Sequence, residues 1–174
     1  MNLPHLISLA NLDADRLNGL LQRAQVLRPQ ALGGVGLRSS LRGKTVCTLF
    51  FEPSTRTRSS FQLAAMRLGA DVLAFDAGTS SGKKGETAVD TMRTLEAMGV
   101  DCFVVRSAVD GELAELIAAA RPETRFINAG AGRSKAWSDG CLTISIGAAV
   151  DGVLDHPVDG GVVGTPPGRV PGRR

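Results

Sequence analysis

The chain has few of the features by which proteins bind nucleic acid. It has no tyrosine and one tryptophan among 174 residues, so stacking of bases on aromatic side chains is not expected. The net charge is only +3, with acidic and basic residues interspersed, whereas a nucleic-acid surface needs clustered lysines and arginines. The arginines near the carboxyl end, Arg169, Arg173 and Arg174, are too few to change this. We therefore predict no nucleic-acid partner.

Cysteine and long apolar runs are also scarce. The three cysteines, Cys47, Cys102 and Cys141, are too far apart to suggest a metal quartet or a disulfide framework. Two of them, Cys47 and Cys102, fall in segments of strand composition, which is typical of small core residues. The sequence shows neither a signal-peptide pattern nor an apolar run long enough to cross a bilayer. It thus predicts no metal, no cofactor, no membrane partner and a cytoplasmic location.

Glycine and proline divide the chain into two parts. Residues 1–130 hold 12 glycines and 4 prolines, and residues 131–174 hold 9 glycines and 4 prolines. Their combined share rises from about 12%, which is ordinary usage, to about 30%, which is typical of low-complexity chain. The overall content of 43% hydrophobic and 21% charged residues suits one globular core. We predict one domain over residues 1–132 and an irregular, poorly ordered Gly/Pro-rich tail over 133–174.

Strand-like and helix-like segments alternate along residues 1–132. Runs of β-branched and apolar residues predict strands at 45–51, 71–75, 101–105 and 124–127. Apolar residues at helical spacing predict helices at 57–68, 86–98 and 111–120. They also predict a first helix that is capped by Asn11 or Asp13 and ends in a loop at Pro29 and 33–36. The predicted fold class is α/β, a parallel sheet with helices on both faces.

The stretch from Phe50 to Phe61, FFEPSTRTRSSF, joins the first strand to the following helix. Its Ser/Thr/Arg cluster lies where helical N–H groups are unpaired and the helix dipole is positive. Hydroxyls and guanidiniums at such a position suit a phosphate or another compact dianion. The alternative is an N-capped helix with two solvated arginines, since capping alone favours serine and threonine.

Polar residues follow the other strands as well. The loop 79–87, TSSGKKGET, follows the second strand, Arg106 the third and Asn128 the fourth. Parallel strands end at one edge of the sheet, where such folds bind ligands, so these loops are expected to converge there. Two alternatives stay open: a solvated surface loop at 79–87, and a salt bridge from Arg106 to an acid such as Asp110.

Taken in order, these motifs resemble the catalytic chain of aspartate carbamoyltransferase, in the aspartate/ornithine carbamoyltransferase family. The resemblance covers about residues 1–132 and rests on STRTR at 54–58, SSGKKGET at 80–87, VVR at 104–106 and INAG at 127–130. The first motif is shared with ornithine carbamoyltransferases, and the KKGET loop favours aspartate.

The resemblance implies a carbamoyl-phosphate-binding domain. The residues that would bind the phosphate are Ser54, Thr55, Arg56 and Thr57. Thr57 and Arg106 would also polarise the carbonyl group, so Arg56, Thr57 and Arg106 are the implied catalytic residues. The family transfers the carbamoyl group of carbamoyl phosphate to L-aspartate in pyrimidine biosynthesis and uses no covalent nucleophile.

The resemblance also implies partners. Ser80 and Lys84 resemble residues that the family contributes to a neighbouring subunit's site, which implies a homotrimer. Glu52 resembles an acid that pairs with arginines of a second domain. L-Aspartate would bind only with that second domain.

The sequence departs from the family pattern after residue 130. Where the family has a His-Pro-Thr-Gln segment that completes the carbamoyl site, Ala136 stands in place of the histidine and Asp139 in place of the glutamine. Arg106 is followed by Ser107 and Ala108, where His-Pro is usual. A shifted reading frame or a truncated gene is one hypothesis for the change.

We therefore predict an aspartate carbamoyltransferase-like protein that is truncated and inactive alone. The alternative is a non-catalytic anion-binding or partner module that assembles with a complete carbamoyltransferase chain.

Overall fold

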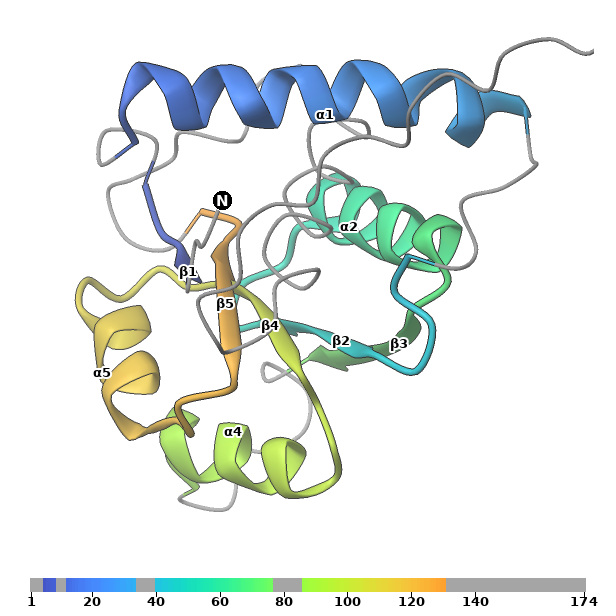
Figure 1. Ribbon diagram of the computed structural model, residues 1–174. Helices are drawn as coiled ribbons and strands as arrows, with labels where there is room; N and C mark the ends of the chain where they lie inside the picture. Colours follow the sequence, from blue (N-terminus) through green and yellow to red (C-terminus); the bar gives the residue numbers. More distant parts are fainter. Residues whose placement is uncertain (1–4, 9–11, 34–39, 77–85, 131–174) are drawn as a thin grey trace, which may run out of the picture.

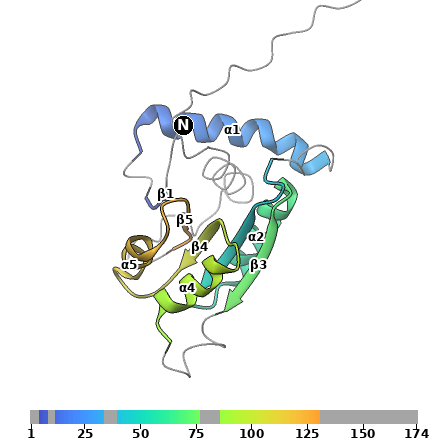
Figure 2. The same cartoon turned by 60° about the horizontal axis from the view of Figure 1, so that its bottom comes forward.

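The chain forms a five-stranded parallel sheet. The computed structural model describes residues 5–8, 12–33, 40–76 and 86–130. The strands are β1 (His5–Leu6), β2 (Thr45–Phe50), β3 (Asp71–Asp76), β4 (Cys102–Arg106) and β5 (Arg125–Asn128). Their order in the sheet is β1-β5-β4-β2-β3, and every neighbouring pair is parallel. Figure 2 shows β1 and β3 at opposite margins of the sheet.

Helices cover both faces of this sheet (Figure 1). They are α1 (Ala14–Gly33), α2 (Thr55–Leu68), α4 (Ala88–Ala97) and α5 (Glu112–Ala119). Buried residues of α1 and α2 belong to one hydrophobic core, and those of α4 and α5 belong to a second core on the other face. The predicted α/β class, a parallel sheet between two helical layers, is confirmed.

The two cores follow from the period of two along each buried strand. In β4, Cys102 and Val104 pack in the core beside α1 and α2, whereas Phe103 and Val105 pack against α4 and α5. By the same alternation Arg106, two residues after Val104, falls on the α1/α2 face of the sheet. The strand therefore decides which helix Arg106 can meet.

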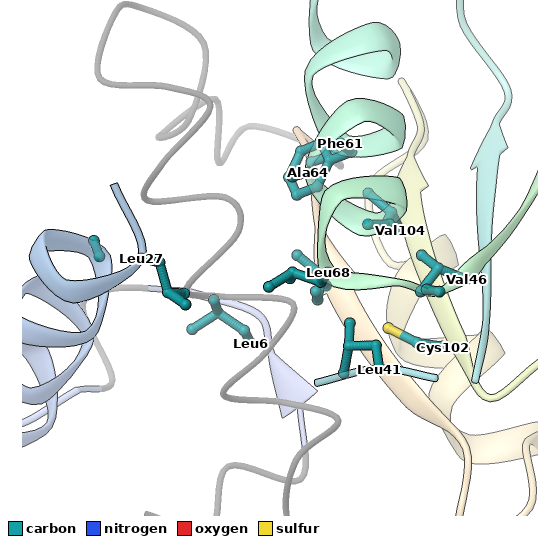
Figure 3. Packing of buried hydrophobic residues seen from close by; sticks show 14 of the residues in the cluster. Leu6, Leu27, Leu41, Val46, Phe61, Ala64, Leu68, Cys102 and Val104 are labelled. Carbon is teal, nitrogen blue, oxygen red and sulfur yellow. The ribbon is translucent and has the colours of Figure 1, made fainter. Parts of the chain in front are cut away.

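Helix α2 packs on the sheet through the face that its sequence predicts. The residues Phe61, Ala64, Ala65 and Leu68 are all buried. Figure 3 shows Phe61, Ala64 and Leu68 turned toward the sheet, with Val46 and Val104 opposite them. Gly69 ends the helix in the left-handed conformation, with φ of 90°, which glycine adopts without steric cost. Burial of this face fixes the position of the amino end of α2.

At the start of the chain one prediction was wrong and one strand was missed. Pro29 was expected to help end the first helix, but α1 continues through it to Gly33. A proline inside a helix removes one backbone hydrogen bond and can kink the helix without ending it. The strand β1 was not predicted, because two residues carry no period; its register with β5 pairs His5 with Phe126 and Leu6 with Ile127.

The residues 131–174 lie outside the described part of the chain, and with them the tail predicted over 133–174 and the departures at Ala136 and Asp139.

Candidate functional site

The amino end of α2 presents hydroxyls and a guanidinium in its first turn. Ser54 is the N-cap residue, and its side chain makes no capping hydrogen bond. Thr55 and Arg56 are exposed, while Thr57 is half-buried. The first turn of this helix contains no acidic residue, so no side chain of its own offsets the positive end of the helix dipole. This turn has the chemistry that an anion requires.

Arg106 ends β4 next to the strand that leads into α2. Phe50, the last residue of β2, is its partner in register, and the Phe51 N–H donates to the Arg106 carbonyl at 2.8 Å. Residues Phe51 to Ser54 then connect β2 directly to α2. The sheet therefore places Arg106 beside the segment that begins the helix.

The Arg106 guanidinium meets Glu52. Arg106 Nε lies 2.5 Å from Glu52 Oε1, and the two side chains are 15% and 30% exposed. Within the described residues, however, no acceptor is aligned with this buried Nε–H. The contact is thus an ion pair without a directed hydrogen bond. Arg106 Nη1 donates to the Ala129 carbonyl at 3.3 Å.

A second arginine of the cluster packs differently from the first. Arg58 Cζ lies 5.2 Å from the centroid of the Phe50 ring, which is a cation–π distance. Arg58 is half-buried, whereas Arg56 is exposed. The two arginines of the STRTR motif therefore differ in exposure. Arg56 is the more accessible to a ligand.

Chemistry through the described cysteines is excluded by their environment. Cys47 and Cys102 are free thiols that are fully buried, as predicted for core residues. Burial raises the pKa of the Cys47 thiol to about 12 and also raises the pKa of Cys102, where nearby Asp101 adds to the effect. Neither thiol forms the thiolate that a nucleophile or metal ligand needs at neutral pH.

Other negative findings concern the described residues alone. They contain no group of three or more His, Cys, Asp or Glu side chains placed to hold a metal ion. None of their helices combines the length and the apolar character needed to span a membrane.

The predicted residues thus divide into two sets. The structure brings together Ser54, Thr55, Arg56 and Thr57 in one turn and places Arg106 at the neighbouring strand end. Ser80 and Lys84 lie outside the described residues. The partnership of Glu52 with Arg106 was missed, because the sequence shows only that each follows a strand and not which side chains meet.

A family model agrees with this geometry. The model for the carbamoyl-P binding domain of aspartate/ornithine carbamoyltransferase matches residues 4–136. The chain belongs to this family. Catalytic subunits of aspartate carbamoyltransferase from Xanthomonas axonopodis pv. citri and Stenotrophomonas maltophilia are each 60% identical to it, over 140 and 141 residues. The predicted family resemblance is therefore confirmed.

Solved structures of family members share the fold. An aspartate transcarbamoylase from Trypanosoma cruzi, crystallised with carbamoyl aspartate and phosphate, superposes with a TM-score of 0.67 at 34% identity and covers 74% of this chain. The catalytic subunit from M. jannaschii gives a TM-score of 0.66 at 33% identity and covers 75%.

The chain corresponds to only part of these relatives. The matches cover 80% of this chain but 44% and 45% of the two bacterial subunits, and 38% of the T. cruzi chain. The chain thus spans less than half the length of the relatives that it matches.

Proposed function

We propose that this chain binds carbamoyl phosphate at the carboxyl edge of β2 and β4. The observation that carries the proposal is Arg106, a family-matched arginine whose buried Nε–H has no aligned acceptor among the described residues. Glu52 Oε1 lies 2.5 Å from that nitrogen but is not aligned with its N–H, and a misaligned hydrogen bond is weak. A phosphorylated substrate beside the amino end of α2 would supply an aligned acceptor.

The proposed roles follow from position. Ser54, Thr55 and Thr57 offer hydroxyls at the positive end of α2, where they and the backbone N–H groups would bind the phosphate. Arg56 would neutralise its charge from the exposed side. Thr57 and Arg106 would donate to the carbonyl oxygen and stabilise the negative charge that grows there during transfer.

The proposed reaction is that of aspartate carbamoyltransferase. The α-amine nitrogen of L-aspartate attacks the carbonyl carbon, a C–N bond forms, the C–O bond to phosphate breaks, and the nitrogen loses a proton. Such a reaction depends on holding two anions together and on stabilising the charge of the transition state. The described domain would supply the carbamoyl phosphate half of this site, and we expect transfer by the 174-residue chain alone to be at or below detection.

Assembly is part of the proposal. Ser80 and Lys84 of this chain resemble residues that reach a neighbouring subunit in the family. We therefore expect the chain to form a homotrimer or to join a longer carbamoyltransferase chain. We also propose a cytoplasmic location, as expected from the sequence.

Calorimetric titration of the 174-residue chain with carbamoyl phosphate, and separately with inorganic phosphate, tests the proposal. We expect saturable binding that weakens as salt rises. Arg56→Ala should lower the affinity about tenfold by removing a charged hydrogen-bond donor. Arg67→Ala is the matched control, since it removes the same charge from the exposed surface at the other end of α2. Equal losses in the two variants, or no binding by the unchanged chain, would overturn the proposal.

A further inference from the structure

Gly130 lies directly against the guanidinium of Arg106. Its φ is +116°, and a Cβ atom built on it would stand 3.0 Å from Arg106 Nη1 and 3.4 Å from Cζ. Such a contact is tighter than ordinary packing allows. A methyl group at this position would therefore require the guanidinium to shift by a few tenths of an ångström.

This close approach distinguishes Gly130 from three other described glycines that also have a positive φ. Gly43, Gly99 and Gly111 have φ of +78°, +97° and +88°, and a Cβ atom on any of them would meet nothing within 4 Å. For these three, glycine relieves backbone strain alone. At Gly130 it relieves backbone strain and also makes room for a side chain.

Asn128 fixes the backbone that carries Gly130. The Asn128 side chain is buried, with 3% of the residue exposed. Its Oδ1 accepts from the Gly130 N–H at 2.8 Å, and its Nδ2 donates to the Ile7 carbonyl at 3.0 Å. The Asn128 amide therefore links the segment after β5 to the segment after β1. These two hydrogen bonds hold the Gly130 backbone in place.

The intervening residue completes the support. The Ala129 N–H donates to the Val105 carbonyl at 2.8 Å, and the Ala129 carbonyl accepts from Arg106 Nη1. The segment 128–130 thus contacts β4 through its backbone and the Arg106 side chain through the Ala129 carbonyl, and Gly130 leaves the space beside the guanidinium free of a Cβ atom. One short segment limits where the guanidinium can lie.

We infer that Asn128 and Gly130 are positioning residues that set the Arg106 guanidinium for its ligand. The inference rests on the proposed function, in which Arg106 contacts carbamoyl phosphate. Neither residue touches the substrate in this account. A misplaced guanidinium loses alignment with the bound carbonyl, since charged hydrogen bonds depend on distance and angle.

The test compares Gly130→Ala with Gly99→Ala in the full chain. Both substitutions add one methyl at a positive φ, but only Gly130→Ala places it against Arg106. Gly130→Ala should weaken carbamoyl phosphate binding about tenfold, as expected when one charged hydrogen bond is lost, while Gly99→Ala should leave the affinity unchanged. Equal affinities for the two variants would overturn the inference.

A double-mutant cycle with Arg106→Ala separates positioning from general damage. In the Arg106→Ala background, Gly130→Ala should cause no further loss of affinity. In the same background, Gly130→Ala should lower the urea midpoint no more than Gly99→Ala does. A Gly130→Ala chain that fails to fold is still informative, because removal of the guanidinium should restore folding; failure to restore it would overturn the inference.

Failure of the proposed function looks different. If the unchanged chain binds no carbamoyl phosphate, the proposed function is wrong. The urea unfolding measurements of the double-mutant cycle then decide by themselves whether Gly130 packs against Arg106 as described.

Discussion

At the scale of single residues, Arg106 is where the proposed ligand would compete with Glu52. Glu52 holds its Nε at 2.5 Å without a directed hydrogen bond, and the ligand proposed for the same guanidinium carries two negative charges. A carboxylate that is 30% exposed can move into solvent at moderate cost. We therefore expect the ion pair between Glu52 and Arg106 to break when the substrate binds.

Glu52→Gln should tighten carbamoyl phosphate binding by roughly three- to tenfold, because it removes a negative charge beside the proposed site. The gain should shrink as salt increases. Calorimetric titrations at two salt concentrations measure both effects. Glu123→Gln is the control, since Glu123 is an exposed acid next to the start of β5, at the opposite edge of the sheet. Weaker binding by Glu52→Gln would show that the pair orders the site instead of competing with the ligand.

His5 makes folding sensitive to pH. Burial, and secondly the charge of Arg125, lower the pKa of His5 from its ordinary value of 6.5. The unfolded chain therefore takes up a proton before the folded chain does, so stability is full above about pH 6.5 and falls as the pH drops through the lowered pKa.

The urea midpoint of the unchanged chain should thus fall more between pH 7.5 and 5.5 than that of His5→Gln. His156→Gln, which changes the other of the two histidines, is the reference for the same substitution. Parallel pH profiles for the His5→Gln chain and the unchanged chain would contradict the assignment.

Sequence predicts residue types at the site better than it predicts their partners. The cluster 54–57 and Arg106 were placed at one edge because strand ends can be read from composition. The contacts of Arg106 with Glu52 and Gly130 could not be predicted, since they depend on which side chain lies over which strand end. Asn128 was expected at this edge, but its amide is used within the fold.

At the scale of elements, α2 is the part of the fold that locates the proposed site. Its apolar face is anchored on the sheet, and one polar contact adds direction: Gln62 Nε2 donates to the buried Thr48 Oγ1 at 3.1 Å. This bond joins the second turn of α2 to the middle of β2. Helices of strong period such as α2 can be predicted from sequence, whereas β1 is too short to be detected and the end of α1 lies beyond the proline that was expected to mark it.

Gln62→Leu should lower the free energy of unfolding by about 1–3 kcal/mol, because it leaves the Thr48 hydroxyl buried without its donor. Adding Thr48→Val should recover much of that loss, since both partners are then apolar. Urea unfolding of the two single variants and the double variant measures the coupling. Additive losses in the double variant would show that the bond does not tie α2 to β2.

At the scale of the whole molecule, the described residues form a five-stranded parallel sheet, and the chain spans less than half the length of its relatives. Its two cores lie on opposite faces of the sheet, and Arg106 lies on the α1/α2 face. The family and the fold class could be predicted from four short motifs and the alternation of strands and helices. The sequence motifs do not show whether the domain binds its ligand without further chain, because affinity depends on every group around that ligand.

The most direct test of the central claim is a carbamoyl phosphate titration of the ¹⁵N-labelled chain, followed by NMR. The account predicts that the largest shifts occur at the backbone amides of Thr55, Arg56 and Thr57 and at the Arg106 Nε–H. Signals at the amino edge of the sheet, such as those of Lys44 and Asp101, which pair with each other at 2.9 Å, should stay in place. Shifts confined to that amino edge, or saturation without any change at Arg106, would contradict it.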